Sequence, residues 1–172
     1  LFSEVETGDY LKNKRDISGL THADIVELHQ KSEGLPLYLR YAAEIIISSE
    51  SLTHAIASLT PASGGDIRNY YGLLWDEFER VGMADAKHLC AVMACMRFGV
   101  HRDEFYKIAA LNRPAFENAY KCICHLLRDS EDRLTVFHNS FREFVINQVP
   151  NDWVKELKIN ICTFLQDNKD SP

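Results

Sequence analysis

The side chain best suited to chemistry in this sequence is His138, within the stretch VFHNSFREF at residues 136–144. Residues 133–137 alternate apolar with polar side chains and are rich in β-branched and aromatic types, which predicts a short strand. Ser140 and Glu143 have the spacing of a capping box, which predicts that a helix opens at Ser140. His138 would then lie at a strand-to-helix turn, close to the amide donors of a helix N-terminus. Such a place commonly binds phosphate or another anion.

A second motif is the corner Gly34-Leu35-Pro36-Leu37. Thr21 and Asp24 form a capping box that opens one helix, and Gly34 ends it. Pro36 suits the first turn of the next helix, because the amide hydrogen that proline lacks would be unsatisfied there anyway. The spacing alone therefore gives Pro36 a complete structural explanation.

Two other kinds of site are disfavoured by spacing. Cys122, Cys124, His125 and His138 could resemble zinc ligands, but a C-x-C-H run within a helix spreads its side chains around the axis, and no second CxxC or HxxxH completes the set. A Cys/His nucleophile pair is equally disfavoured, because every cysteine falls within an apolar helical pattern and a buried thiol is inert. The loop GxxxxGK[ST] that binds nucleotide phosphates is absent, since no lysine follows a glycine.

Composition places the chain among ordinary globular proteins. Its 172 residues are long enough to bury roughly 70% of the unfolded surface. No run approaches the roughly 20 apolar residues of a membrane span, so we expect a soluble protein. The 5 cysteines are odd in number and form no CxxC pair, which favours reduced thiols and a cytoplasmic location. Leu1 is not a methionine and no signal-like segment follows, so we expect a piece of a longer polypeptide.

The order of predicted elements indicates a mainly α fold. Helices are predicted at residues 66–81, 85–98 and 101–111, and Pro114 opens another. Asp85 and Asp152 are predicted helix caps. The turn at residues 129–132 would join residues 126–127 to the strand at 134–137 as a hairpin. Three helices followed by a hairpin is the order of a winged helix.

The predicted domain boundaries follow from these elements and from the linker-like sequence before Asp66. They are residues 1–20 as a remnant of a preceding domain, 21–60 as a small helical domain, 61–65 as a linker, 66–149 as a winged-helix domain with a short hairpin wing, and 150–172 as the start of a further helical region.

Nucleic-acid binding is disfavoured by charge. The chain carries 19 Lys and Arg against 25 Asp and Glu, a net charge of -6, so its long-range field opposes a phosphate backbone. Residues 113–128 would supply the recognition helix, but this segment offers only the cations Arg113, Lys121 and Arg128 and also carries the acid Glu117. The predicted wing also carries Asp129, Glu131 and Asp132. An acidic wing repels phosphates, which favours a protein-facing role.

With the corner at 34–37 and the stretch at 137–144 in this order, the sequence resembles the STAND class of P-loop NTPases. It is most similar to their NACHT branch, with the NB-ARC proteins further off. In that class a nucleotide-binding domain precedes a helical domain with a G-x-P corner, then a winged helix with a histidine motif, then a sensor region. The resemblance covers residues 15–148 and implies the regulatory half of such a protein, without the Walker residues of the nucleotide-binding domain.

By this resemblance, Pro36 corresponds to the proline that packs near the adenine, and His138 to the histidine that reaches the β-phosphate of bound ADP. The implied cofactors are ADP and ATP with Mg in the full-length parent, with no tight binding to this chain alone. The implied partners are the upstream P-loop domain, downstream sensor repeats, and further copies of the protein once it is activated. The chain itself would be no enzyme and would hold its parent inactive while ADP is bound.

Two other function classes stay open. A DNA-binding winged-helix regulator would need salt-sensitive duplex binding by the face of residues 113–128. A protein-interaction domain would keep the same fold without any nucleotide dependence. Only the NTPase hypothesis requires a P-loop upstream of Leu1.

Overall fold

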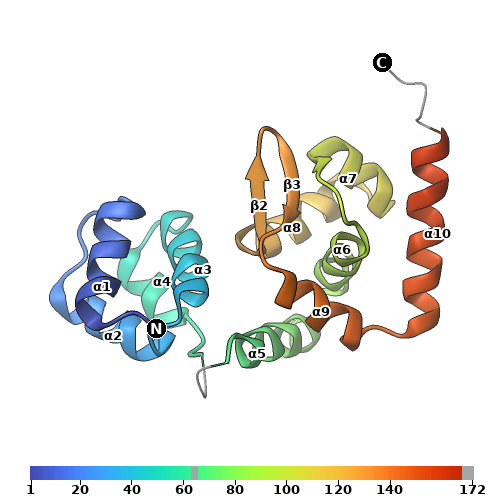
Figure 1. Cartoon of the computed structure of the whole chain (residues 1–172). Coiled ribbons are helices and arrows are strands. Elements are labelled where there is room, and N and C mark those ends of the chain that lie inside the picture. Colours follow the sequence, from blue (N-terminus) through green and yellow to red (C-terminus); the bar gives the residue numbers. More distant parts are fainter. Residues whose placement is uncertain (63–65, 168–172) are drawn as a thin grey trace. The chain divides into compact units, whose positions relative to one another are not determined.

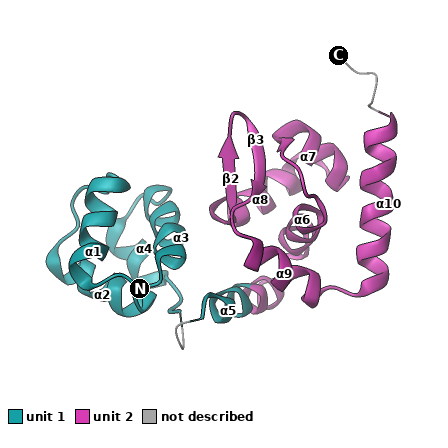
Figure 2. Cartoon of the chain, viewed as in Figure 1, with its two compact units in different colours: residues 1–74 teal, residues 75–172 magenta. Residues whose placement is uncertain are grey.

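The computed structural model describes residues 1–62 and 66–167, which are mainly helical with one small antiparallel sheet (Figure 1). The chain divides into two compact units, Leu1–Leu74 (unit 1) and Trp75–Pro172 (unit 2) (Figure 2). The division falls within helix α5, Ile67–Arg80. Residues 63–65 of the predicted linker lie outside the described part of the chain.

Unit 1 is a set of short helices whose starts are fixed by local side-chain caps. Thr21 and Asp24 form the predicted capping box, and Pro36 occupies the first turn of its helix as expected. Ser3 and Glu6 form a second capping box near the N-terminus. The elements are α1 (Glu4–Asp9), the π-helix η1 (Tyr10–Lys14), α2 (His22–Ser32), α3 (Pro36–Ile47), α4 (Leu52–Ser58) and the first half of α5.

Tyrosines from α3 and α5 form the centre of unit 1. Tyr41 stacks on Tyr70 with ring centroids 5.7 Å apart, and its hydroxyl lies 3.2 Å from that of Tyr71. The Tyr38 hydroxyl donates to the carbonyl of Thr60 at 2.7 Å. Each buried phenol thus keeps a polar partner while its ring fills the core, which is how tyrosine is buried at low cost.

The corner between α2 and α3 is held by the N-terminal segment. Gly34 has a φ of +70°, and a Cβ built on it would lie 2.3 Å from the carbonyl oxygen of Phe2. The amide of Phe2 in turn donates to the Gly34 carbonyl at 2.7 Å. Glycine is required at position 34 for two reasons. The backbone there is left-handed, and another backbone segment passes against it.

We predict that Gly34→Ala destabilises unit 1 by at least ~2 kcal/mol, since it adds a steric clash to the strain of a positive φ. Gly19→Ala is the matched control: its φ is +80°, but the nearest atom to its Cβ is a leucine methyl 4.0 Å away. It should cost only about 1 kcal/mol. Urea unfolding of both variants measures the difference, and equal costs would contradict the proposed packing of Phe2.

Unit 2 surrounds a central helix, α6. This helix contacts α8, α9 and α10, and its side chains from Ala86 to Ala94 are largely buried. Asp85 is not its cap as predicted, because the helix begins at Ala84 with Met83 in the cap position. The helices are the rest of α5, α6 (Ala84–Cys95), α7 (Arg102–Ala109), α8 (Arg113–Ile123), the 3-10 turn η3 (Cys124–Leu126), α9 (Asn139–Gln148) and α10 (Asn151–Asp167).

The sheet of unit 2 has the strand order β1-β3-β2 and is antiparallel. Strands β2 (Leu127–Ser130) and β3 (Arg133–Val136) form the predicted hairpin. Strand β1 (Val100–His101) was not predicted, because two residues carry no readable alternation and His101 was assigned to a helix. Its Val100 pairs with Leu134.

The predicted fold class is confirmed: a mainly α chain with a small helical part, then a winged-helix-like part, then a further helix. Helices α6, α7 and α8 precede the hairpin in the expected order. Asp152 lies inside the first turn of α10 and does not precede it as the predicted cap would. Within the described residues, no helix is both long and apolar enough to cross a membrane.

His125 is a buried titratable group in the core of unit 2. It lies in η3, between α8 and β2, and is 6% exposed. Burial lowers the pKa of its imidazole from the usual 6.5 to about 4. The folded chain therefore keeps His125 neutral in a range of pH where the unfolded chain protonates it.

We predict that acid destabilises unit 2 through this residue. Between pH 6.5 and about 4 the unfolded state binds a proton that the folded state does not, so stability falls as the pH falls. Replacing His125 by glutamine should reduce that dependence by roughly 1 kcal/mol per pH unit. The measurement is urea unfolding at several pH values. His54→Gln, at an exposed position, serves as the control and should leave the pH dependence unchanged.

Candidate functional site

The hairpin delivers His138 to the start of α9. After β3, the amide of Phe137 donates to the carbonyl of Leu126 at 3.0 Å, which continues the pairing for one more residue. His138 itself is extended, with φ -139° and ψ 137°, and α9 begins at the next residue. The histidine is thus at the strand-to-helix turn that the sequence predicts, and it is exposed.

The residue that caps α9 is His138, which corrects the predicted capping box. Nδ1 of His138 accepts the amide hydrogen of Ser140 at 3.2 Å and lies 2.7 Å from the Ser140 hydroxyl. Glu143 accepts from the side chain of Asn139 at 2.7 Å, so it makes no box with Ser140. The cap of α9 thus lies two residues earlier in the chain than the Ser-x-x-Glu spacing implies.

This cap fixes which nitrogen of the ring carries the proton. Because Nδ1 accepts a backbone hydrogen, the neutral imidazole must carry its own hydrogen on Nε2. Within the described residues, the hydrogen bonds of the His138 side chain are made through Nδ1 to Ser140. Nε2 is therefore a donor available to an outside acceptor, as an anion contact requires.

Helix α9 holds this histidine on a well-packed support. Phe141 and Val145 are buried, and α9 lies against α6 (Figure 1). Phe144 meets the ring of Trp75 edge-on with centroids 6.2 Å apart. A cap residue on a helix docked in this way has a defined direction, which a residue on a free loop would lack.

Pro36, the other predicted ligand residue, belongs to unit 1 and His138 to unit 2. Pro36 is exposed at the first helical position of α3. One turn further on, Arg40 contacts Glu44 at 3.3 Å, and Arg15 also pairs with that carboxylate. The exposed proline thus lies on the same face of α3 as this ionic cluster.

Sequence reasoning missed a polar cavity in unit 2 beside α9. It has a volume of about 510 Å³, and its walls are Arg97, Asn139, Arg142, Glu143, Ile146 and Asn147. The sequence placed Arg142 in the helix that follows His138, but it did not indicate a cavity there. The hydrogen-bond partner of Arg142 could not be predicted from the sequence, because Arg142 donates to the carbonyl of Met96, 46 positions away in the chain.

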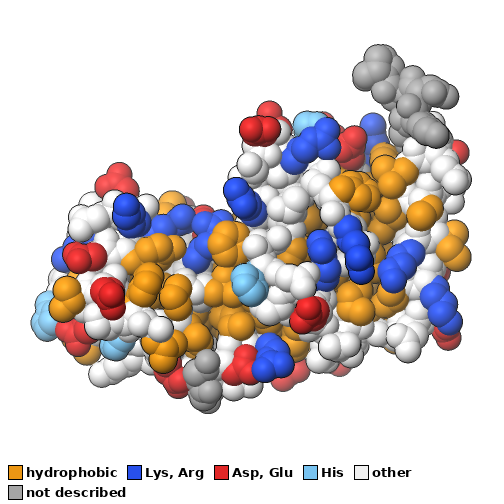
Figure 3. All heavy atoms as spheres, viewed as in Figure 1, with side chains coloured by type: hydrophobic (Ala, Val, Ile, Leu, Met, Phe, Trp, Pro, Cys, Tyr) orange, Lys and Arg blue, Asp and Glu red, His pale blue; other side chains and the backbone are white. Residues whose placement is uncertain are grey.

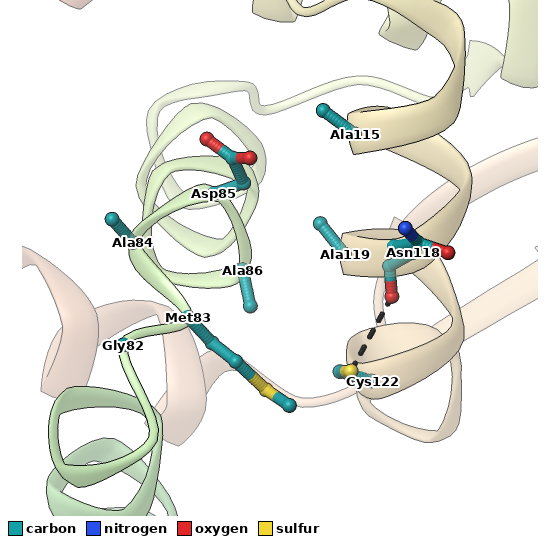
Figure 4. Close-up of a pocket in the computed structure, with 9 residues that line it drawn as sticks. All are labelled: Gly82, Met83, Ala84, Asp85, Ala86, Ala115, Asn118, Ala119 and Cys122. Carbon is teal, nitrogen blue, oxygen red and sulfur yellow. Dashed lines mark hydrogen bonds between the residues drawn. The ribbon is translucent and has the colours of Figure 1, made fainter.

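A second cavity, of about 380 Å³, lies between the start of α6 and α8 (Figure 4). Small side chains line it, including Ala86, Ala115 and Ala119, and the Met83 side chain extends toward Cys122. The Cys122 thiol donates to the Asn118 carbonyl at 3.3 Å, and burial raises its pKa. A thiol held in this way is a poor nucleophile.

No metal-binding group is found in the described part of the chain: three or more His, Cys, Asp or Glu side chains do not gather anywhere there. The cysteines considered as zinc ligands bond locally instead. The Cys124 thiol, for example, donates to the carbonyl of Lys121 at 3.4 Å.

The arginines on α7 and α8 are held by neighbouring acids and aromatic rings. Arg113 contacts Asp103 at 3.0 Å and Glu117 at 3.1 Å. Arg102 also pairs with Glu117 and lies over the ring of Tyr120 at 4.2 Å. These arginines are neutralised within the unit, which weakens any attraction of this face for DNA.

Comparison with protein-family models, with curated proteins and with solved structures finds no match to this chain.

We predict that His138→Ala destabilises unit 2 by about 1 kcal/mol, because it removes the acceptor for the Ser140 amide. His138→Asn should change stability by only a few tenths of a kcal/mol, since asparagine is itself a good helix cap. Thermal or urea unfolding distinguishes the two. If the asparagine variant lost as much stability as the alanine variant, the ring would be stabilising α9 by some means other than capping.

Proposed function

We propose that this chain is the regulatory, non-catalytic part of a signalling NTPase of the STAND class, of the NACHT type. In this proposal it helps to clamp ADP on an upstream nucleotide-binding domain of a cytoplasmic parent protein. The observation that carries the proposal is the geometry of His138: a helix-cap histidine whose Nε2 hydrogen is free to donate to an anion. The order of the Gly34–Pro36 corner and the histidine motif in the sequence supports it.

The proposed switch depends on one hydrogen bond. A hydrogen bond from imidazole to a charged phosphate contributes roughly 1.5–3 kcal/mol. Loss of ~2 kcal/mol shifts an equilibrium between closed and open forms about thirtyfold. Exchange of ADP for ATP with Mg would break this contact, release the winged-helix-like unit, and allow copies of the parent to assemble.

Pro36 has a packing role in this proposal. It is exposed and has no amide hydrogen, so the start of α3 presents an apolar ring that adenine could contact. The phosphate chemistry itself would belong to the upstream domain, because the chain lacks the lysine loop and Walker acids. Sensor repeats downstream would complete the parent.

The paired arginines of α7 and α8 argue against the DNA-binding alternative. The hairpin adds exposed acids at its tip, Glu131 and Asp132, where a DNA-binding wing would present cations. A nucleotide-independent interaction domain is the alternative that the experiment below distinguishes.

The decisive experiment is an ADP titration by calorimetry on this chain and on a longer form that includes the residues upstream of Leu1. We expect ADP to bind tightly to the longer form only. In that form His138→Asn should weaken ADP binding roughly tenfold or more, because asparagine restores the cap but lacks the Nε2 donor.

His54→Asn is the control, since His54 is also exposed and should leave ADP affinity unchanged. Unchanged affinity in His138→Asn would return the histidine to a purely structural role. Absence of ADP binding to the longer form would contradict the NTPase hypothesis and favour an interaction domain.

A further inference from the structure

The cavity beside α9 combines cationic and amide side chains around one opening. Arg97 comes from the segment that follows α6, whereas Asn139, Arg142 and Asn147 come from α9. Ile146 adds an apolar wall. At about 510 Å³, its volume is within the range of small-molecule sites.

One of its arginines is fixed in place. Nη2 of Arg142 donates to the carbonyl of Met96 at 2.7 Å, and its Nε is buried without a hydrogen-bond partner in the described residues. The guanidinium is therefore pre-oriented by the loop between α6 and β1. A planar, immobilised guanidinium matches the paired oxygens of a phosphate.

The other cations nearby are not neutralised. Within the described residues, Arg97 and Lys158 make no ion pair, unlike the arginines of α7 and α8. Burial raises the pKa of the Cys95 thiol, and the charges of Lys158 and Arg142 oppose that rise. Figure 3 shows several Lys and Arg side chains together over this part of unit 2, beside hydrophobic ones.

Among the described residues, Glu143 is the one carboxylate that lines the cavity. Glu143 accepts a hydrogen bond from Asn139 at 2.7 Å, and it offsets one of the two lining arginines. The two lining arginines outnumber this carboxylate, so the local charge stays positive in a chain whose net charge is -6. A positive cavity in an acidic protein selects an anionic ligand against the general field of the molecule.

We propose that this cavity is a binding site for a phosphate-bearing small anion, of the pyrophosphate or nucleoside diphosphate kind. Arg142 would meet the phosphate oxygens in a fixed orientation, Arg97 would close over them, and the amides of Asn139 and Asn147 would donate further hydrogen bonds. The proposed site includes neither His138 nor an upstream domain, so its test is independent of the proposed function.

The experiment is a titration of the whole chain with pyrophosphate, and in parallel with ADP, followed by calorimetry and by amide chemical shifts at low ionic strength. We expect saturable binding with a dissociation constant below about 1 mM, with shifts centred on Arg97 and Asn139. Arg97→Gln should weaken it roughly tenfold. Arg97 is exposed and has no described partner, so this variant should fold normally.

Equal affinity for pyrophosphate and ADP would mean that the diphosphate alone is recognised. Tighter binding of ADP would mean that the nucleoside makes further contacts.

Arg128→Gln is the matched control, because it removes an exposed arginine of β2 that lies outside the cavity. It should change the affinity twofold or less. Lack of saturation, or equal weakening by both variants, would overturn the proposal. So would equally tight binding of a polyglutamate peptide that Arg97→Gln weakens to the same extent, since that would make the cavity a docking site for acidic protein segments.

Discussion

The hydrogen bond from the Ser140 amide to Nδ1 of His138 is the interaction on which the candidate site depends. It satisfies one of the amides left open at the start of α9, and at the same time it sets the tautomer of the ring. A Ser, Asp or Asn in this place would cap the helix equally well, but none of them has a ring N–H at the position of Nε2. The choice of histidine therefore couples the stability of the helix to the availability of Nε2 for an outside acceptor.

The hairpin that leads to this cap has a strained turn. Glu131 and Asp132, the two turn residues, both have positive φ, of 55° and 61°. Tight turns of this kind favour Asn-Gly, since most other residues are strained there. Pairing across β2 and β3, with β1 added beside β3, outweighs this strain. The register in turn brings Phe137 opposite Leu126 and ends the strand at the position where His138 can cap α9.

Charge is distributed unevenly over unit 2. On α7 and α8, where a DNA-binding winged helix needs free cations, arginines are paired with Asp103 and Glu117. Beside α9, Arg97 and Lys158 have no acidic partner within the described residues, and Arg142 is tied to a backbone carbonyl. The winged-helix-like unit therefore has arginine charge without an ion pair near the histidine cap, whereas the arginines of α7 and α8 are paired. This distribution fits a small anionic ligand better than a duplex.

Local signals in the sequence determined much of this structure. The capping box of Thr21 and Asp24, the proline at the start of α3 and the alternation in β3 each depend on residues a few positions apart, so each was predictable. The exposed His138 at a strand-to-helix turn was predictable for the same reason. Only the tertiary structure decided what depends on distant partners: the pairing of β1 with β3, the contact of Phe2 with Gly34, the replacement of Ser140 by His138 as the cap, and the bond from Arg142 to Met96. A local pattern fixes backbone conformation within a turn or a strand, whereas these features require segments far apart in sequence to meet, and their positions are set by packing of the whole unit.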